Sequence, residues 1–564
     1  MVRQAIDHLT EVRSMSQQLD HTVGGLLDAV AERFPERDAL VYPGRGLRYT
    51  YREFNEVCRR VAGGLLRLGI RKGDTVSIWA YNVPEWVILQ FATAKIGAIL
   101  VTVNTSYKSA ELEYILSQSD STTLFMVGSF KDTDYVATLC EVIPELVTSI
   151  PGELAAPKLP CLRNVVFIGE ETPAGMLNFE RIMELGSEVA DAELAAVEAT
   201  LDRHDTINMQ YTSGTTGFPK GVMLTHYNVV NNGFNIGECM KLTEHDRLCI
   251  PVPFFHCFGC VLGVMACVTH GTAMVPVEVF DPLTVLQTIE QERCTGVHGV
   301  PTMFIAELEH PEFSRFDLSS LRTGIMAGSN CPIEVMKKVI SQMHAAEITI
   351  AYGQTEASPV ITQTRTDDAI ELRVATVGRA LPDVEVKIVD IESGATLPPG
   401  KQGELCTRGY LVMKGYYKMP EETARAIDAD GWLHTGDLAI MDENGYCKIT
   451  GRIKNMIIRG GENIYPREIE EFLYTHPKIS DIQVYGVPDR KYGEQVMAAV
   501  ILKKGQTMTG EEVREFCHGR IANYKIPRYV KFVESYPMTA SGKIQKFKMR
   551  DLAIKELQLE EDGL

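Results

Sequence analysis

Residues 211–221, YTSGTTGFPKG, combine residue types that bind phosphate groups. Glycine lets backbone N–H groups approach an anion closely, hydroxyl groups donate hydrogen bonds, and a lysine adds positive charge. The segment is not a Walker A loop, because Lys220 lies between Pro219 and Gly221 and not in a Gly-Lys-Ser/Thr run. The alternative is an ordinary surface turn rich in Gly and Thr. The candidate phosphate ligands are Thr212, Ser213, Gly214, Thr215, Thr216, Gly217 and Lys220.

Further segments downstream carry residues that could do chemistry: PFFHCFG (253–259), GVPTM (299–303), MAGSNCP (326–332), AYGQTEASP (351–359), GWLHTGD (431–437), GRIKNMIIRGGENIYPREIE (451–470) and PMTASGKIQK (537–546). Each has an ordinary structural explanation when it is taken alone. His256 among aromatic residues could be a buried core histidine, Glu356 a solvated acid and Asp437 a turn former. The order of the segments along the chain is therefore needed to distinguish a functional site from ordinary structural roles.

In this order the segments resemble the adenylate-forming superfamily, which comprises acyl-CoA synthetases, luciferases and nonribosomal-peptide adenylation domains. TSGTTGFPKG is similar to the phosphate loop of that family, and AYGQTE, TGD, GR and SGK follow in the family's order. The resemblance extends from the twenties to about residue 550. Residues 301–329 and 351–360 look most like the medium-chain acyl-CoA ligase branch, which includes the mitochondrial acyl-CoA synthetase family member two.

The resemblance implies a ligase that uses ATP with Mg²⁺ and then CoA. A carboxylic acid would first join the α-phosphorus of ATP with release of pyrophosphate, and CoA would then take the acyl group and release AMP. Because a carboxylate must approach a triphosphate, such a site depends on placed positive charge. The residues implied as catalytic are Lys543, Glu356, Thr212, Lys220 and His256, with Glu356 and Thr212 at the metal.

The same resemblance implies the nucleotide site and a moving C-terminal domain. Adenine and the α-phosphate would be framed by Ala327, Gly328, Ser329, Tyr352, Gly353, Gln354 and Thr355, and the ribose by Asp437 with Arg452. The domains would be residues 1–452 and 453–564, with the hinge at Lys454. In the second orientation CoA would pass a channel beside Gly460 and Gly461, where side chains would obstruct it.

The acid that is activated is less well defined than the nucleotide. The implied acyl pocket is apolar and offers no Lys or Arg for a second carboxylate. Its residues would be Gly233, Phe234, Gly237, Phe255, His256, Cys257, Val300 and Met326. A medium-chain, branched or alicyclic monocarboxylic acid is favoured, and long-chain and aryl acids remain open. Two other functions are also open: transfer to a carrier-protein thiol, and an inactive nucleotide-dependent binding module.

The length and charge of the chain limit the classes of function and partner that remain possible. The chain has 564 residues, enough for two or more domains, and a formal net charge of −18, which argues against nucleic acid as a partner. One segment, 521–550, is locally basic, with seven Lys or Arg residues and one acid. It could be a solvated face or an anion site. The expected partners are a small carboxylic acid, ATP and CoA, and a homo-oligomer is left open.

The thirteen cysteines are scattered through the chain, which favours reduced thiols over a disulfide framework. Cys257, Cys260, Cys267 and His270 have zinc-ligand types, but the residues between them are apolar, so core packing is favoured. The N-terminal segment has no apolar run of a secretory signal, and no apolar stretch reaches the length of a membrane span. A cytoplasmic protein is expected.

The pattern of the chain predicts the elements that must position these residues. Short apolar runs at 74–82, 121–127, 164–169 and 271–277 alternate with amphipathic stretches, which is typical of an α/β fold with buried, largely parallel sheet. Strand-like pieces at 384–391, 401–407 and 445–450 predict a β-rich, barrel-like subdomain. A small α+β domain follows the boundary near 452–455. We therefore expect two α/β subdomains, the β-rich subdomain and a small mobile C-terminal domain.

Overall fold

The structure is a computed structural model that describes residues 18–212, 219–328, 331–460, 462–539 and 544–559. The chain divides into two compact units. Unit 1 comprises residues 1–385 and 407–433, and unit 2 comprises residues 386–406 and 434–564. The predicted domain boundary at 452 and the predicted hinge at Lys454 both lie within unit 2, and both stay predictions.

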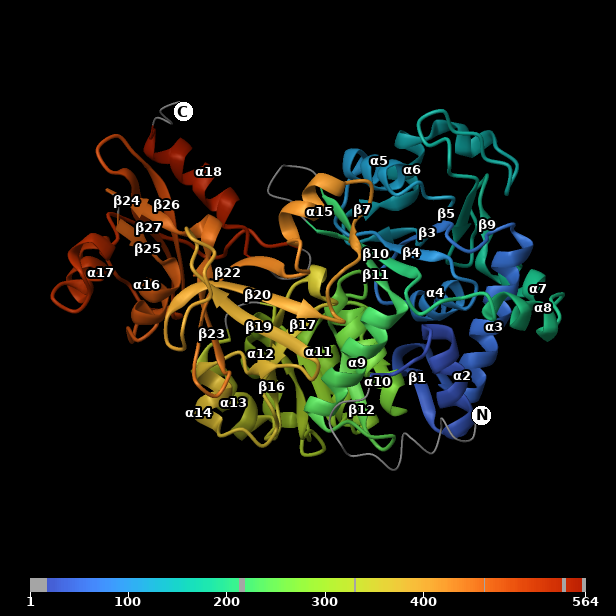
Figure 1. Cartoon of the computed structure of the whole chain (residues 1–564), viewed down its shortest axis with the longest axis horizontal. Coiled ribbons are helices and arrows are strands. Elements are labelled where there is room, and N and C mark those ends of the chain that lie inside the picture. Colours follow the sequence, from blue (N-terminus) through green and yellow to red (C-terminus); the bar gives the residue numbers. More distant parts are fainter. Residues whose placement is uncertain (1–17, 213–218, 329–330, 461, 540–543, 560–564) are drawn as a thin grey trace. The chain divides into compact units, whose positions relative to one another are not determined.

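Unit 1 contains two mixed sheets (Figure 1). The eight-stranded sheet holds the phosphate-loop strands next to a parallel group formed by β4, β3, β5 and β8. Its order is β21 (Gly415–Tyr416), β11 (Lys220–Thr225), β10 (Thr206–Thr212), β4 (Ile99–Thr102), β3 (Thr75–Trp79), β5 (Thr123–Met126), β8 (Asn164–Phe167) and β9 (Leu177–Asn178).

The nine-stranded sheet is parallel in its middle and antiparallel at both edges. Its order is β18 (Arg379–Ala380), β17 (Val360–Gln363), β16 (Thr349–Gly353), β15 (Thr323–Met326), β14 (Gly296–Gly299), β12 (Arg247–Ile250), β13 (Ala273–Pro276), β1 (Asp38–Tyr42) and β2 (Leu47–Thr50). The parallel strands are short and largely buried, as expected for strands covered on both faces.

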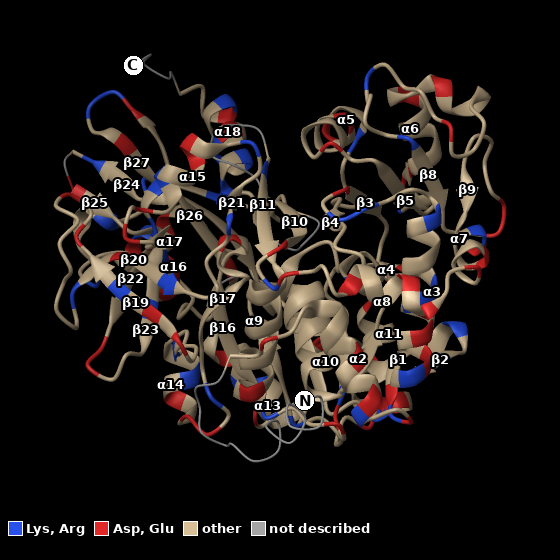
Figure 2. Ribbon diagram, turned by 45° about the vertical axis from the view of Figure 1, so that its right-hand side comes forward, with Lys and Arg blue, Asp and Glu red and all other residues tan. Residues whose placement is uncertain are grey.

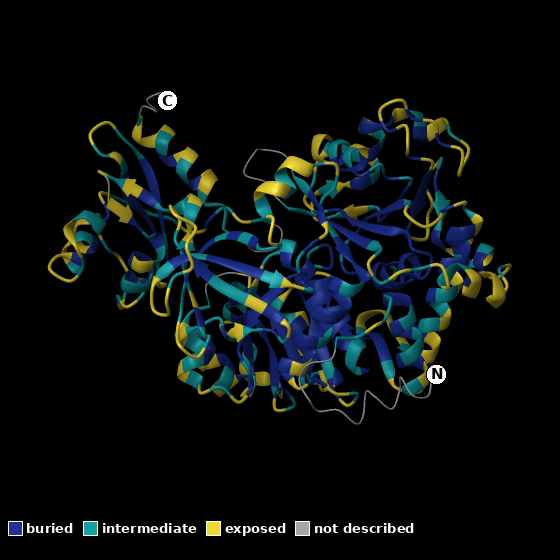
Figure 3. Ribbon diagram, in the orientation of Figure 1, coloured by how far each residue is buried: buried dark blue, intermediate teal, exposed yellow. Residues whose placement is uncertain are grey.

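The helices of unit 1 begin at readable signals and bury apolar faces. Thr50 and Glu53 form a capping box at the start of α3 (Tyr51–Arg67), and Thr225 with Asn228 caps α9 (His226–Met240). In α4 (Pro84–Lys95) every residue except Glu85 is buried (Figure 3). The other helices are α2 (Val23–Arg33), α5 (Ser109–Gln118), α6 (Tyr135–Val142), α7 (Phe179–Gly186), α8 (Asp191–Glu198), α10 (Ala266–His270), α11 (Pro282–Glu292), α12 (Pro301–Leu308), α13 (Ile333–Gln342), α14 (Ile370–Ala375) and α15 (Pro420–Ala426).

Unit 2 is built on two sheets. The first has the strand order β19 (Val384–Val389), β20 (Gln402–Gly409), β22 (Leu433–Met441) and β23 (Cys447–Arg452). Of these strands, β23 lies entirely in unit 2, and each of the others has one end in unit 1. The second has the order β25 (Glu462–Ile464), β24 (Ile457–Arg459), β27 (Gly493–Leu502) and β26 (Ile479–Asp489), with β28 (Tyr529–Phe532) on β27. Its helices are α16 (Pro466–Leu473), α17 (Gly510–Cys517) and α18 (Lys546–Leu557).

The predicted α/β class, the predicted strands and the predicted β-rich region are confirmed by these elements. None of the helices within the described ranges has the length and apolar character to span a membrane. Cytoplasmic localisation stays a prediction. Cys257, Cys260 and Cys267 are buried, and burial raises the pKa of the Cys260 and Cys267 thiols well above its usual value. Core packing of these cysteines is therefore confirmed.

The basic segment 521–550 is largely compensated by acids from elsewhere in unit 2. Lys525 lies 2.5 Å from Glu468, and Lys546 lies 2.5 Å from Glu470. The segment also pairs Lys531 with Glu556. Figure 2 shows acidic and basic positions interspersed along the C-terminal elements. The local charge excess in the sequence is thus no isolated basic patch, which favours the solvated-face interpretation.

Candidate active site

Thr212 and Lys220, the described members of the phosphate-loop candidates, lie at the end of an antiparallel strand pair in unit 1. β10 and β11 pair antiparallel with Thr212 opposite Lys220, so the loop between them joins two adjacent strands. Tyr114 on α5 donates a hydrogen bond to the Pro219 carbonyl at 3.0 Å, which anchors the returning end of the loop. Thr212 and Lys220 are described. The other loop candidates, Ser213, Gly214, Thr215, Thr216 and Gly217, lie outside the described residues.

Lys220 is held by two side chains, one from β21 and one from α15. Its ammonium forms an ion pair with Glu422 on α15 and lies 5.0 Å from the centroid of the Tyr416 ring. The Lys220 side chain is 11% exposed and that of Glu422 is 22% exposed. The hydrogen bond from Lys220 lowers the pKa of the Glu422 carboxyl. Lys220 is therefore a positioned charge and not a freely moving surface lysine.

Glu356 lies next to the same cluster. It is part of the short 3₁₀ turn η5 (Thr355–Ala357), where its carboxylate accepts a hydrogen bond from the Tyr416 hydroxyl at 2.9 Å. The Thr212 hydroxyl approaches the same carboxylate oxygen at 3.5 Å. Burial, and then the charge of Glu356, raises the pKa of the Tyr416 phenol far above its usual value. The phenol therefore keeps its proton and donates a hydrogen bond to the Glu356 carboxylate.

The contacts of Lys220 and Glu356 assemble a hydroxyl, a carboxylate, a phenol and an ammonium at one end of the hairpin. Carboxylate and hydroxyl oxygens are ligands that suit Mg²⁺, so Glu356 and Thr212 fit the predicted metal role. Tyr416 and Glu422 were not predicted from the sequence. Their contribution depends on the pairing of β21 with β11, in which Tyr416 lies opposite Val222.

We expect Glu422→Gln to raise the KM for ATP about threefold to tenfold with a smaller effect on kcat. The Lys220 ammonium has three N–H donors, so it can contact Glu422 and a phosphate at the same time. Loss of the negative charge of Glu422 weakens the contact that positions Lys220. Steady-state kinetics with varied ATP measures this. Glu421→Gln is the matched control, because Glu421 is 88% exposed and forms a long ion pair with Arg425, at 3.9 Å. A lower KM in Glu422→Gln would instead mean that Glu422 competes with phosphate.

The backbone just before Glu356 packs closely against the backbone of Pro359. A Cβ atom on Gly353 would lie 1.8 Å from the Pro359 carbonyl oxygen, so only glycine fits there. The Gln354 amide donates to the same oxygen at 2.9 Å. Tyr352 is half-buried at the end of β16, and the buried Thr355 hydroxyl lies 3.7 Å from the Cys257 sulfur. The turn is therefore fixed by packing before any nucleotide is considered.

The next candidates follow β15. Ala327 is buried, and Gly328 has a φ of 89°, a left-handed conformation that favours glycine. A Cβ atom on Gly328 would lie 3.0 Å from Val300 Cγ1. β15 and β16 are parallel neighbours, so Gly328 and Tyr352 follow the carboxyl ends of adjacent strands, which is where ligands of open α/β sheets bind. Ser329 lies outside the described residues.

His256 begins the apolar helical stretch that the sequence analysis singled out. Its Nδ1 accepts a hydrogen bond from the amide of Phe258, the first residue of the π-helix η3 (Phe258–Met265), at 3.1 Å. That bond places the ring proton on Nε2 in the neutral form. Phe255 and Cys257 on either side are buried. His256 thus has a defined structural contact, and its predicted catalytic role stays a prediction.

The other predicted acyl-pocket residues are packed against neighbouring side chains of unit 1. Gly233 and Gly237 are closely packed. A Cβ atom on Gly233 would lie 2.8 Å from Met265 Cβ, and a Cβ atom on Gly237 would lie 2.3 Å from the His270 ring. Phe234 stacks on the same His270 ring with centroids 5.5 Å apart. Met326 is fully buried in the core cluster of the nine-stranded sheet. Close packing explains both glycines, and the acyl-pocket assignment stays a prediction.

His298, which carries no functional signal in the sequence, connects three elements of unit 1. Its Nε2 donates to the Leu262 carbonyl at 3.0 Å, and its Nδ1 accepts from the Ile325 amide at 3.2 Å. Burial lowers its pKa to about 4, so the ring is neutral at physiological pH. His298 on β14 thereby fixes the π-helix against β15, although no feature of HGVPTM distinguishes it from an ordinary core histidine.

In unit 2 the predicted ribose residues form a pair. β22 and β23 place Asp437 opposite Arg452, and Arg452 Nε lies 2.7 Å from Asp437 Oδ1. The Asp437 side chain is nearly fully buried, whereas that of Arg452 is about half exposed. The Thr435 hydroxyl donates to the Leu405 carbonyl at 2.6 Å and accepts from the Asp437 amide at 3.1 Å. Asp437 is therefore held in a fixed orientation.

The predicted hinge and CoA-channel residues come soon after Arg452 in the chain. Lys454 lies in the exposed 3₁₀ turn η6 (Ile453–Asn455). Gly460 has a φ of 60° at the turn between β24 and β25, where Arg459 pairs with Glu462, and its amide donates to the Tyr492 carbonyl at 2.8 Å. Glycine suits this two-residue hairpin turn for conformational reasons alone. Gly461 and Lys543 lie outside the described residues, and the roles of all four stay predictions.

The family described as AMP-binding enzyme matches residues 27–417, and the AMP-binding enzyme C-terminal domain matches residues 468–543. The chain belongs to the AMP-binding enzyme family. YngI of Bacillus subtilis (strain 168), whose name places it with the acyl-CoA synthetases, is 59% identical over 97% of this chain and 99% of its own. The mitochondrial medium-chain acyl-CoA ligase ACSF2 of Bos taurus is 43% identical over 95% of this chain and 88% of its own.

Solved structures of the adenylate-forming superfamily share the fold. The anthranilate CoA ligase AuaEII in complex with anthranoyl-AMP has a TM-score of 0.83 at 28% identity, covering 96% of this chain and 99% of that one. ATP-bound MatB from Rhodopseudomonas palustris has a TM-score of 0.81 at 28% identity, covering 94% and 99%. The predicted superfamily, fold class and AMP-forming acyl-CoA synthetase class are confirmed.

Proposed function

We propose that this AMP-forming acid–CoA ligase activates medium-chain carboxylic acids in a Mg²⁺-dependent reaction. The convergence of Thr212, Glu356 and Tyr416 beside Lys220 carries the proposal, because it supplies oxygen ligands for a metal and a fixed positive charge for phosphates. The reaction class rests on the family. The metal, the acid and the individual residue roles are proposals that the arrangement supports.

In the first step a carboxylate oxygen attacks the α-phosphorus of ATP. The bond from that phosphorus to the β-phosphate bridging oxygen breaks, and pyrophosphate leaves with the electron pair. Lys220 would balance charge on the β- and γ-phosphates, and Glu356 and Thr212 would hold Mg²⁺, whose positive charge would screen the phosphates. Tyr416 would orient the Glu356 carboxylate by donating a hydrogen bond to it. Lys543 supplies a further cation as charge develops.

In the second step the CoA sulfur attacks the acyl carbonyl carbon of the adenylate. The bond from that carbon to the bridging oxygen breaks, the oxygen stays on AMP, and the thiol proton is released. Asp437, held by Thr435 and paired with Arg452, would accept hydrogen bonds from the ribose hydroxyls. Rotation about Lys454 would exchange Lys543 for the Gly460–Gly461 face between the two steps, a hinge motion of a known kind.

The proposed acid class draws on apolar residues near the carboxyl ends of the strands and on the relatives. Phe255, Cys257 and Val300 are buried and apolar, which suits a hydrocarbon tail. The relative ACSF2 is named as a medium-chain acyl-CoA ligase, whereas AuaEII acts on an aryl acid. The higher sequence identity to ACSF2 favours the medium-chain class for this chain.

We expect catalytic efficiency to rise with acid length and then to fall once the tail exceeds the cavity. Each methylene that stays buried contributes up to about 0.8 kcal/mol, or roughly fourfold. A panel from acetate to palmitate, with benzoate and cyclohexane carboxylate, measures kcat/KM by CoA-thioester formation. The optimum should lie at medium length, and the KM for ATP, as an internal control, should stay nearly constant.

Two results would contradict the proposed acid class. Efficiency that still rises at palmitate would indicate an open tunnel and a long-chain enzyme, and a clear preference for benzoate would indicate an aryl acid ligase. Gly237→Trp is not a suitable probe of cavity length, because the His270 ring lies against Gly237 and a large side chain would disturb helix packing first.

A further inference from the structure

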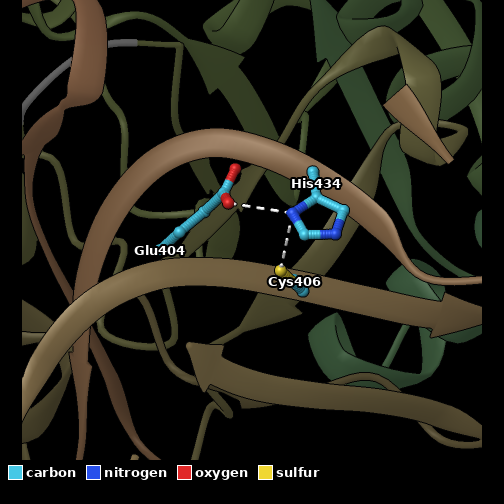
Figure 4. A group of neighbouring side chains, drawn as sticks. All are labelled: Glu404, Cys406 and His434. Carbon is cyan, nitrogen blue, oxygen red and sulfur yellow. Dashed lines mark hydrogen bonds and ion pairs between the residues drawn. The ribbon is translucent and has the colours of Figure 1, made fainter. Parts of the chain in front are cut away.

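Three side chains with metal-ligand chemistry meet in unit 2, on the first of its sheets. Glu404 and Cys406 lie two residues apart on β20, so their side chains point to the same face of the sheet, and His434 lies on the neighbouring strand β22. The ligand atoms of the three side chains all lie within 4.8 Å of one another (Figure 4). The zinc-like motif considered in the sequence, at Cys257 to His270, lies elsewhere in the chain and packs in the core.

The three side chains converge on a single ring nitrogen. His434 Nδ1 lies 2.9 Å from Glu404 Oε2 and 3.4 Å from the Cys406 sulfur. One ring nitrogen either donates its proton or accepts one, so it cannot serve the carboxylate as a donor and the thiol as an acceptor at the same time. A cation at the common focus of the three atoms satisfies all of them together.

The distances suit a transition metal ion. In a tetrahedral zinc site, bond lengths of about 2.3 Å to sulfur and about 2.0 Å to nitrogen or oxygen place sulfur and nitrogen about 3.5 Å apart, and nitrogen and oxygen about 3.3 Å apart. The observed 3.4 Å and 2.9 Å differ from these by a few tenths of an ångström. For these two pairs small side-chain shifts would give the tetrahedral spacing, and the Glu404 oxygen and the Cys406 sulfur lie within 4.8 Å of each other.

Burial and hydrogen bonding also fit a metal site with one open position. The Cys406 residue is fully buried, and the Glu404 and His434 side chains are 13% and 33% exposed. Glu404 Oε1 accepts a hydrogen bond from the Gly436 amide at 2.9 Å, which orients the carboxylate and leaves Oε2 directed at His434. Fixed carboxylates of this kind are typical of metal ligands. The partly exposed edge of His434 provides an entry path.

We propose that Glu404, Cys406 and His434 bind one Zn²⁺ ion, with a water molecule as the fourth ligand. A thiolate and an imidazole favour a thiophilic transition metal over Mg²⁺ or Ca²⁺, which prefer oxygen ligands. The site is therefore chemically distinct from the Mg²⁺ site proposed at Glu356 and Thr212. Binding would release the thiol proton of Cys406 and cross-link β20 to β22, the strand that carries Asp437 three residues after His434.

Co²⁺ titration of the full-length, metal-free protein tests the proposal. Co²⁺ bound to a thiolate produces a near-ultraviolet charge-transfer band, which should saturate at one equivalent and disappear when Zn²⁺, but not Mg²⁺, is added. Cys406→Ala and His434→Ala should lose that band. The matched controls Cys447→Ala and His476→Ala, which alter a buried cysteine and a histidine of the same unit outside the cluster, should keep it.

A second readout covers the case in which a variant folds poorly. Zn²⁺ should raise the Tm of the wild-type protein and of both controls, because a ligand that binds only the folded state stabilises it. The conservative Glu404→Gln variant should need at least tenfold more Zn²⁺ for the same shift. Absence of a thiolate band in the wild-type protein, or the same band in folded Cys406→Ala, would overturn the proposal.

Discussion

Lys543→Ala is expected to lower acyl-adenylate formation by on the order of a hundredfold to a thousandfold, while thioester formation from supplied acyl-adenylate changes less than about threefold. The lysine is expected to stabilise charge that develops as the carboxylate meets the α-phosphate, and a single such group contributes on this scale. It has no part in the attack of CoA if the C-terminal domain has turned away. ATP–pyrophosphate exchange measures the first step, and release of CoA thioester from acyl-adenylate measures the second.

Lys548→Ala is the matched control for that variant. Lys548 is an exposed lysine of the same segment, on α18, and its ammonium lies 5.9 Å from the Phe547 ring centroid. Its loss removes the same charge without the predicted contact, so both half-reactions should stay near wild type. Equal loss of both half-reactions in Lys543→Ala would reject the division of labour between two domain orientations.

Glu356→Gln is expected to reduce adenylation about a hundredfold and to raise the Mg²⁺ concentration required for half-maximal rate. The amide keeps the shape of the side chain and can still accept from the Tyr416 hydroxyl and approach Thr212, so the change removes chiefly the negative charge. A metal ligand that loses its charge binds Mg²⁺ weakly, and the phosphates then lose their screening. Initial rates of pyrophosphate release over a Mg²⁺ series measure both effects.

Tyr416→Phe separates orientation of the carboxylate from its charge. It deletes the hydroxyl that donates to Glu356 at 2.9 Å but leaves the carboxylate and the ring beneath Lys220 in place. We expect a loss of about tenfold, as for removal of one hydrogen bond to a charged group. If Glu356→Gln were no worse than Tyr416→Phe, with an unchanged Mg²⁺ requirement, Glu356 would not be a metal ligand.

Much of the fold was predictable because buried parallel strands read as short apolar runs. The runs at 74–82, 121–127, 164–169 and 271–277 contain β3, β5, β8 and β13, respectively. The order of the strands within each sheet was not predictable from the same runs. It depends on pairing between distant segments, such as β21 with β11, for which local composition carries no signal.

The candidate site was predictable where its residues lie in continuous motifs. Thr212, Lys220 and Glu356 were singled out from TSGTTGFPKG and AYGQTE, and the structure brings Thr212 and Glu356 within 3.5 Å. Tyr416 and Glu422 were missed because GYYKMPEE has the composition of an ordinary surface segment, and only the sheet register brings it beside the loop. The same reason hides the Glu404, Cys406 and His434 cluster, whose members come from two strands.

The central claim, that this protein activates an acid as an acyl-adenylate and then transfers it to CoA, is tested most directly by following oxygen. The enzyme is supplied with a medium-chain acid labelled with ¹⁸O in both carboxylate oxygens, together with ATP, Mg²⁺ and CoA, and the products are analysed by mass spectrometry. Attack of the carboxylate on the α-phosphorus, followed by cleavage of the acyl carbon–oxygen bond, predicts AMP that carries one ¹⁸O atom and unlabelled pyrophosphate. ADP with ¹⁸O in inorganic phosphate would indicate an acyl-phosphate route and would contradict the account.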